Sequence, residues 1–413
     1  MIKTAPTPEA SRATERVARE SYGKLIAILA AQDRDIATAE DALSDALAAA
    51  LKAWSTQGVP ANPEGWLVTT ARNLRKNIAR GAAVRVRAEP EILRRIEEAQ
   101  DKPEPSPLSD ERLRLMFVCA HPAIDPAART PLILQTVLGI DATRIARAFL
   151  VPPATLSQRL VRAKTRIRDA GLIFALPAPE DLAPRLEAVL DAIYAAFGAG
   201  WDGLDVLDDP EALTGEAIWL ARLLVAQLPD EPEPKGLLAL MLHCAARRRA
   251  RRDEHGRFVP LDQQDARLWD RTMVIEAETL LTNAARAGRF GRFQCEAAIQ
   301  SVHVQRPITG RLNLSALRTL YDLLVERTGS LGAQIGRAVV LAEGGDPAAA
   351  AAALDALPAD RVARHQPWWV ARARIAALAG NPALQRESLR QAIDLTEDEA
   401  MRNFLNDQYV ALT

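Results

Sequence analysis

The most informative segment of the sequence is residues 141–168, DATRIARAFLVPPATLSQRLVRAKTRIR. Asp141 can cap a short helix in which Ile145 and Phe149 are expected to face inward. The proline pair Pro152-Pro153 then predicts a turn followed by the start of a second helix, where proline is tolerated because an N–H has no helical partner there. Two helices joined by so short a turn predict a helix-turn-helix.

The second helix of this motif has an apolar side and a polar side. The apolar side, which is expected to pack, consists of Leu156, Leu160, Ala163 and Ile167. Seven basic residues and no acidic one occur between Thr143 and Arg168, so the polar side suits phosphates and base edges. The candidate contacts to duplex DNA are Thr155, Ser157, Gln158, Arg159, Arg162, Lys164 and Arg166. An ordinary solvated basic helix is the alternative.

A second basic run lies further toward the N-terminus. Asn62 can cap a helix and Pro63 suits its first turn, so a helix is predicted from there through Trp66 to about residue 80. The run contains no acidic residue and comprises Arg72, Arg75, Lys76, Arg80, Arg85 and Arg87. A positive groove with stacking surfaces holds single-stranded DNA, which makes this helix a candidate for binding melted DNA. The alternative for Trp66 is a place in the core, since tryptophan is highly buried on average.

An acidic helix precedes both basic segments. In the sequence AEDALSD, residues 39–45, Asp41 and Asp45 are four apart and share one helix face. An acidic, partly apolar surface suits a basic protein partner rather than DNA. The alternative is a solvated helix start, where carboxylates are favoured by the helix dipole.

The chain divides into several helical parts. Apolar periodicity before Trp66 indicates two further amphipathic helices, which complete a compact first domain. A charged, proline-containing segment then predicts a linker. The expected boundaries are 1–87 for the first domain, 88–108 for the linker, 109–175 for the second domain and 180–413 for a helical extension.

The extension carries a weak internal repeat. The tetrapeptides GDPA at residue 345 and GNPA at residue 380 lie 35 residues apart, and each opens a helix rich in Ala and Leu. This period is close to that of tetratricopeptide hairpins, in which a turn glycine precedes a helix that packs on the previous one. Trp368 and Trp369 are therefore expected in the core of a repeat. Arg247 to Arg252 form a basic cluster that suits nucleic acid, an interdomain latch onto acidic segments, or a solvated helix end.

Composition favours an all-α protein and excludes a membrane protein. Hydrophobic residues make up 48% and aromatic residues 5%, with Ala and Leu prominent, which favours helix over strand. The 52 basic and 53 acidic residues nearly cancel, so only their local distribution is informative. No apolar run reaches the roughly 18 residues of a membrane span, and the N-terminus lacks a signal-peptide core. A cytoplasmic location is expected.

No residue pattern points to an enzyme, a cofactor or a metal. Cys119, Cys244 and Cys295 are scattered, and a zinc site needs three or four converging ligands, so reduced and mostly buried thiols are expected. The sequence GAGWDG at 198–203 satisfies the GxGxxG pattern, but it follows an amphipathic helix instead of a strand. We interpret it as a helix-end loop.

Three segments together resemble extracytoplasmic-function sigma factors, which retain sigma domains two and four joined by a linker. These are AEDALSDALAAALKAW (39–54), NPEGWLVTTARNLRKNIARGAA (62–83) and the helix-turn-helix. The resemblance implies that core RNA polymerase is bound through its beta-prime clamp helices and its beta flap. The implied contacts to the clamp helices are Glu40, Asp41, Leu43, Asp45 and Ala46. The implied contacts to the minus-10 element are Trp66, Arg72, Asn73, Arg75, Lys76 and Arg80. The helix over 153–168 would bind the minus-35 element.

Two further segments, LRLMFVCAHP (113–122) and AFLVP (148–152), resemble a narrower subgroup of these factors with a tetratricopeptide-like C-terminal extension. The resemblance implies that the extension modulates activity in place of a separate anti-sigma factor and offers a surface for a protein partner. Gln385 and the segment 306–313 depart from the subgroup's pattern. Two rival functions stay open, namely a one-component regulator with 180–413 as its sensor and a protein-binding repeat scaffold.

Overall fold

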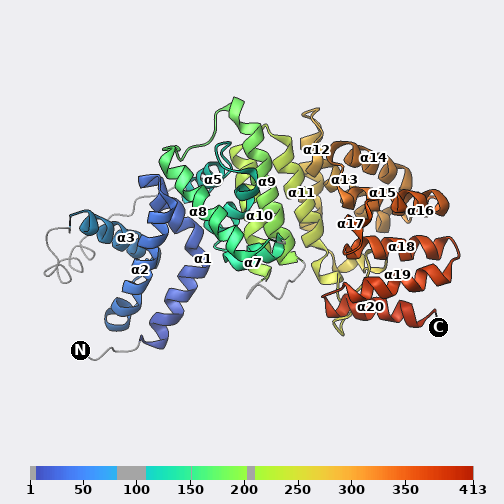
Figure 1. Cartoon of the computed structure of the whole chain (residues 1–413), viewed down its shortest axis with the longest axis horizontal. Helices are drawn as coiled ribbons and strands as arrows, with labels where there is room; N and C mark the ends of the chain where they lie inside the picture. Colours follow the sequence, from blue (N-terminus) through green and yellow to red (C-terminus); the bar gives the residue numbers. More distant parts are fainter. Residues whose placement is uncertain (1–5, 81–107, 150, 202–209, 413) are drawn as a thin grey trace. The chain divides into compact units, whose positions relative to one another are not determined.

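The computed structural model describes residues 6–80, 108–149, 151–201 and 210–412 (Figure 1). These residues form helices and no β-strand, apart from one isolated antiparallel bridge between Arg252 and Phe258. The predicted all-α fold is confirmed. The chain divides into two compact units, Met1–Leu223 and Leu224–Thr413. The expected linker over 88–108 lies outside the described residues except for its last one.

The first unit begins with a bundle of three helices, α1 (Pro8–Asp33), α2 (Ile36–Gln57) and α3 (Pro63–Arg80). Arg34 ends α1 in a left-handed conformation with φ of 57°, and Asp35 caps α2 by accepting a hydrogen bond from the Thr38 amide at 3.2 Å. As predicted, Asn62 precedes α3, and its side chain accepts from the amide of Gly65 at 2.9 Å. Caps of this kind satisfy amides that have no helical partner.

Apolar packing and one polar cluster hold the bundle together. Its fully buried side chains include Leu25, Leu29, Leu43 and Leu67. Glu64 on α3 is ion-paired with Lys24 on α1 and accepts a hydrogen bond from Ser21 at 2.5 Å. Burial alone would raise the pKa of Glu64, but the bonds from Lys24 and Ser21 hold it below its usual value. The first and third helices are thus fixed to each other.

Four helices follow: α5 (Leu108–Cys119), α6 (Pro126–Thr136), α7 (Ala142–Ala148) and α8 (Pro153–Asp169). Asp141 caps α7 as predicted, accepting from the Thr143 amide at 2.8 Å. Ile145 is buried, but Phe149 is 38% exposed, so the expectation that both face inward was wrong for Phe149. Phe149 is the C-cap of α7 and has left the helical conformation, which takes its ring away from the stripe occupied by Ile145.

Two more helices, α9 (Pro179–Trp201) and α10 (Pro210–Gln227), come next, and α9 packs on α5 and α6. The first unit therefore includes α9 and most of α10, which belong to the segment 180–413 that we expected as an extension. Residues 198–201 of the GxGxxG pattern are the last turn of α9 rather than a loop, and residues 202–203 lie outside the described part.

The second unit continues with further helices connected in series. Their bounds are α11 (Pro232–Ala246), α12 (Arg271–Ala285), α13 (Arg292–Thr309), α14 (Leu314–Thr328), α15 (Leu331–Glu343), α16 (Pro347–Asp355), α17 (Ala359–Val362), α18 (Gln366–Leu378), α19 (Pro382–Asp394) and α20 (Glu399–Val410). Consecutive helices pack on each other from α13 to α16, and again from α18 to α20.

The two GxPA tetrapeptides occupy equivalent turns in this unit. Gly345 and Gly380 have positive φ of 100° and 67°, a conformation that glycine adopts without steric cost. Asp346 and Asn381 then cap α16 and α19. Each tetrapeptide thus turns the chain between two helices that pack together, α15 with α16 and α18 with α19.

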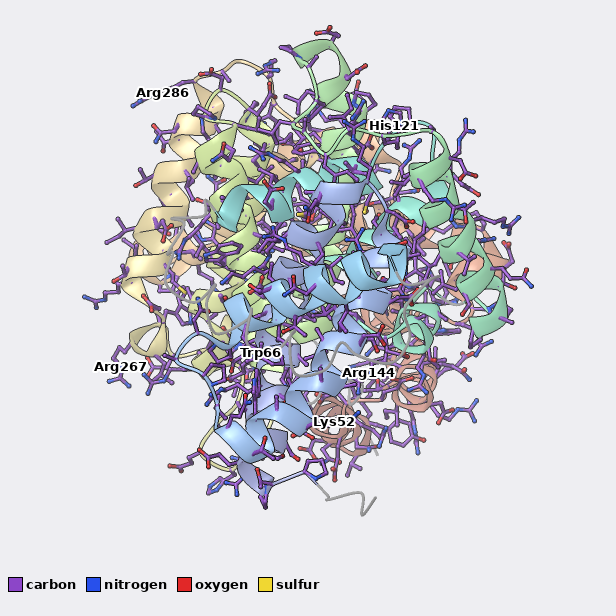
Figure 2. The ribbon with its side chains drawn as sticks, turned by 90° about the vertical axis from the view of Figure 1, so that its left-hand side faces the viewer. Lys52, Trp66, His121, Arg144, Arg267 and Arg286 are labelled. Carbon is purple, nitrogen blue, oxygen red and sulfur yellow. The ribbon has the colours of Figure 1, made fainter. Side chains whose placement is uncertain are left out.

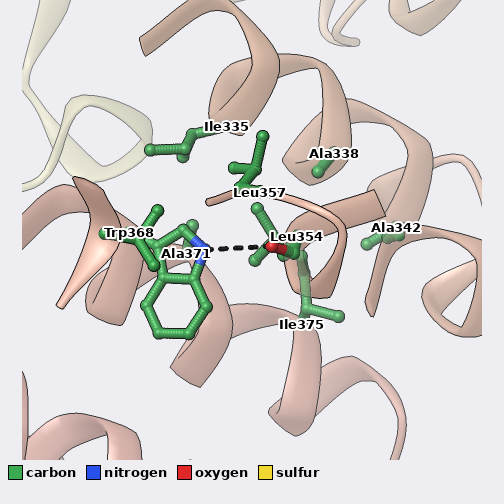
Figure 3. Packing of buried hydrophobic residues seen from close by; sticks show 10 residues of the cluster. Ile335, Ala338, Ala342, Leu354, Leu357, Trp368, Ala371 and Ile375 are labelled. Atoms are coloured by element: carbon green, nitrogen blue, oxygen red, sulfur yellow. Dashed lines mark hydrogen bonds between the residues drawn. The ribbon is translucent and has the colours of Figure 1, made fainter. Parts of the chain in front are cut away.

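Trp368 anchors the core between these helices. It is 4% exposed and packs with Ile335, Leu354 and Leu357, as Figure 3 shows. Its indole N–H donates to the carbonyl oxygen of Leu354 at 3.3 Å. The core position predicted for Trp368 is confirmed, whereas Trp369 is only partly buried and donates to the Ala363 carbonyl at 3.1 Å.

Candidate functional site

The helix α8 presents a face suited to a large polar partner. The four apolar side chains predicted to pack, Leu156, Leu160, Ala163 and Ile167, are all buried. Because they fix the rotation of α8 against α6 and α7, the remaining side chains must point outward. Among the predicted DNA contacts, the exposed ones are Ser157, Gln158, Arg162 and Arg166, whereas Thr155, Arg159 and Lys164 are half-buried. The other exposed residues of α8 are Pro153, Ala154, Val161, Thr165, Arg168 and Asp169.

Val161 was not singled out by its sequence pattern. Its side chain is 63% exposed and lies on the same side of α8 as Gln158 and Arg162. An apolar side chain among basic and amide groups matches a major groove, where thymine methyl groups lie beside hydrogen-bonding base edges. Valine is usually a core residue, so its residue type alone does not predict an exposed side chain. The exposure of Val161 follows from the way α8 is rotated against its neighbours.

Lys164 differs from its basic neighbours. Its ammonium lies 2.7 Å from each carboxylate oxygen of Glu40 on α2, although the two residues are 124 positions apart. The Lys164 side chain is 11% exposed and that of Glu40 22%. This pair joins a candidate DNA-binding residue to a candidate polymerase-binding residue.

Part of the acidic face of α2 is exposed to solvent. Asp41 and Asp45 are exposed, one helical turn apart, while Leu43 and Ala46 are buried in the bundle. Leu43 and Ala46 therefore hold α2 in place rather than offering contact area. Of the five residues that the resemblance implies as clamp-helix contacts, Glu40, Asp41 and Asp45 are at least partly exposed.

The basic side of α3 is described in part. Arg72 is exposed, and Asn73 and Arg75 are half-buried; burial lowers the pKa of Arg75. Trp66 is 6% exposed and meets Trp54 edge to face at 5.5 Å, so it is a core residue of the bundle. Figure 2 labels the position of Trp66. The side chains of Lys76 and Arg80, and all of Arg85 and Arg87, lie outside the described residues.

The basic cluster in the second unit is largely structural. Arg247 is buried, donating to the His243 carbonyl at 3.0 Å and to Gln300 at 2.5 Å. Arg252 is ion-paired with Asp398 at 2.5 Å. Because Arg252 and Asp398 both belong to the second unit, their ion pair is not the interdomain latch that the sequence left open.

The thiols are shielded from reaction. Burial raises the pKa of Cys119 to about 12 and that of Cys295 to about 11, and it also raises the pKa of Cys244. Within the described ranges, no group of three or more His, Cys, Asp and Glu side chains is placed to hold a metal ion. In the same part of the chain, no helix is long and apolar enough to cross a membrane.

Comparison with known proteins defines the class. Residues 17–84, which form most of the α1–α3 bundle, match sigma-70 region 2. Residues 185–285 match a family of unknown function, DUF6596. The chain thus combines an N-terminal sigma-70 region 2 domain with a DUF6596 domain. Sigma-70 region 2 implies a sigma factor, which is a non-enzymatic transcription factor that binds core RNA polymerase.

A related chain is known from Rhizobium meliloti. The uncharacterized protein R00370 of Rhizobium meliloti (strain 1021) is 36% identical over 330 residues, which cover 78% of this chain and 78% of that protein. The present chain belongs to the same family as R00370. No solved structure matches.

Proposed function

We propose that this protein is an alternative sigma factor of the extracytoplasmic-function type whose activity is modulated by its own C-terminal helices. The observation that carries the proposal is the combination of a sigma-70 region 2 match over 17–84 with the exposed basic face of α8. The first feature is expected to bind polymerase and melted DNA, and the second to bind duplex DNA. Both are needed for promoter-specific initiation.

The acidic face of α2 is the proposed polymerase contact. Asp41 and Asp45 are exposed on a helix whose position is fixed by buried Leu43 and Ala46. Charge complementarity of this kind raises association rates and selects partners. Glu40 completes the surface when it is released from Lys164.

The minus-10 contacts are proposed on α3, through Arg72, Asn73 and Arg75 and, beyond the described side chains, Lys76 and Arg80. Because Trp66 is buried against Trp54, we assign it a supporting part in this contact. The minus-35 contacts are proposed on α8, where Arg162 and Arg166 suit phosphates and Gln158 suits a base edge.

The modulating part of the chain is proposed to begin at α9. This helix packs on α5 and α6, and α10 is tied to α5 by an ion pair between Arg112 and Glu216. A movement of α9 or α10 is therefore expected to shift α5 and α6, on which the proposed DNA-binding helix α8 packs. Removal of residues 180–413 is expected to change promoter-specific transcription strongly, and unchanged output would contradict self-regulation.

The test is binding of the purified chain to core RNA polymerase at fixed salt. The Asp41→Arg/Asp45→Arg variant should bind at least about tenfold more weakly than the unmodified chain, because it reverses the charge of the contact surface. Glu387→Arg/Asp394→Arg on α19 is the matched control, since it makes the same change in net charge at two exposed positions in the other unit.

Three outcomes separate the possibilities. Equal loss of binding in both double variants would attribute the effect to net charge and contradict the proposed surface. Absence of polymerase binding by the unmodified chain and also by Lys164→Glu, which breaks the ion pair with Glu40, would contradict the sigma function. Duplex binding that persists in that case would favour the one-component regulator.

A further inference from the structure

The two domains that are proposed to bind polymerase and the minus-35 element are in contact with each other. Lys164 of α8 donates two hydrogen bonds to Glu40 of α2, both at 2.7 Å. Lys164 is less exposed than Arg162 and Arg166 on the same helix because α2 packs against α8. Charge-assisted bonds to both carboxylate oxygens fix the two helices in one register.

Close backbone packing accompanies the ion pair. The amino-terminal helix α1 packs on α5, and a Cβ atom on Gly23 of α1 would overlap the carbonyl oxygen of Val137 at the end of α6. Next to it, the ring of Tyr22 lies against Gly139, which has φ of 65°. Burial, with a contribution from the nearby Glu40 carboxylate, raises the pKa of Tyr22. Two glycines thus permit an approach that larger side chains would prevent.

We infer that the free chain holds itself closed through this contact, and that it must open for core polymerase to bind. The inference rests on the proposed function and adds its regulation. Each member of the pair belongs to a surface that the proposed function needs. A polymerase helix reaching Glu40 must displace α8, and a DNA duplex reaching Lys164 must displace α2.

The contact is suited to a reversible switch. Its ion pair is partly exposed, so water and a competing charged partner can replace each bond without leaving a fully buried charge. A closed state that holds about nine chains in ten would weaken the apparent affinity for polymerase about tenfold. Breaking the contact between α2 and α8 should restore the tenfold loss in apparent affinity for polymerase.

The first test uses Lys164→Glu in the full chain, which places like charges where the ion pair now lies. Although it alters the proposed DNA-binding helix, it should bind core polymerase more tightly than the unmodified chain, by about tenfold. Arg162→Glu is the matched control, because it makes the same charge change on the same helix at an exposed side chain. An equal gain in both variants would overturn the inference.

The second test opens the contact from its other side. In Gly23→Ala the added methyl group must push α1 away from Val137, while alanine preserves the helix itself. The readout in the free chain is amine acylation of Lys164, measured by peptide mass spectrometry against the exposed Lys52. We expect slow acylation of Lys164 in the unmodified chain, faster acylation in Gly23→Ala, and tighter polymerase binding by that variant.

The outcomes distinguish the inference from the proposed function. Acylation of Lys164 as fast as that of Lys52 in the unmodified chain would overturn the closed state and leave the sigma function intact. Faster acylation in Gly23→Ala with unchanged polymerase affinity would likewise overturn the inference. Failure of every variant to bind polymerase, despite faster acylation, would refute the sigma function and with it the regulatory inference.

Discussion

Arg112 on α5 and Glu216 on α10 form an ion pair that joins two helices far apart in the sequence of the first unit. The Arg112 guanidinium also lies 4.6 Å from the centre of the Trp219 ring. Arg112 is only 8% exposed, and burial lowers its pKa to about 10. Because a buried arginine stays charged at neutral pH, Glu216 and Trp219 are needed to compensate for its lost hydration.

Removing one member of this pair should destabilise the first unit. Glu216→Ala leaves the Arg112 charge buried with one partner fewer, and such changes cost about 3 kcal/mol. The free energy of unfolding by urea, followed for the first unit, measures the cost. A double-mutant cycle with Arg112→Ala should show coupling, whereas Arg147→Ala at an exposed position is the control. Additive losses in the cycle would contradict a direct interaction.

Substitutions on α8 should separate general from specific DNA binding. The Arg159→Ala/Arg162→Ala variant is expected to lose duplex affinity by about 1–3 kcal/mol for each contact and to show a shallower dependence on salt concentration. Binding to a minus-35 duplex, measured at several salt concentrations, tests this. Unchanged affinity would exclude α8 as the DNA-binding helix and favour the repeat scaffold.

The exposed position of Val161 leads to a different expectation. Val161→Ala removes apolar surface but no charge, so the salt dependence of DNA binding should stay the same. The preference among base pairs should change, because apolar contact with a thymine methyl group would be lost. Comparing affinities for a set of duplexes with single base-pair changes measures this. A uniform change across all of them would contradict a base contact.

Local features of this fold could be predicted from the sequence. Caps and helix starts depend on a few adjacent residues, so Asp141, Asn62 and the proline-initiated α8 were placed correctly. The buried side of α8 followed from helical spacing in the same way. Such predictions succeed because each concerns one helix and its own periodicity.

Contacts between distant residues could not be predicted. The Glu40 and Lys164 pair depends on how α2 and α8 meet, and no local pattern specifies that meeting. The burial of Leu43 and Ala46 within an acidic helix and the exposure of Phe149 are also set by packing. The predicted helices therefore agree with the structure, but the exposure of individual side chains on them is set by the tertiary structure.

The core around Trp368 should control the stability of the second unit. Trp368→Ala is expected to cost about 3–5 kcal/mol, because it leaves a cavity among Ile335, Leu354 and Leu357. Trp368→Phe keeps most of the apolar volume but loses the hydrogen bond to the Leu354 carbonyl, at a cost of about 1 kcal/mol. Urea unfolding of the second unit measures both. If Trp368→Ala and Trp368→Phe lowered the free energy of unfolding equally, the apolar volume of the ring would contribute nothing beyond the hydrogen bond, which would contradict this expectation.

The second unit should lose stability on mild acidification because of His243. This residue is fully buried on α11, and burial, together with the Arg247 charge, lowers its pKa from 6.5 to about 4. Between these values the unfolded chain binds a proton that the folded chain does not, so the free energy of unfolding falls as pH decreases from about 6.5 toward about 4. The contribution at the acid end is about 3 kcal/mol.

The variant that tests this is His243→Gln, which cannot take up the proton. It should reduce the slope of unfolding free energy against pH in that window, even if it lowers stability at neutral pH. His255→Gln, at an exposed position, is the matched control. His303 is half-buried, and its pKa is also lowered to about 4 by desolvation and by the charges of Arg247 and Arg306, so part of the slope should remain and disappear only in the variant that lacks both histidines. An unchanged slope in that double variant would show that neither imidazole is held neutral by burial.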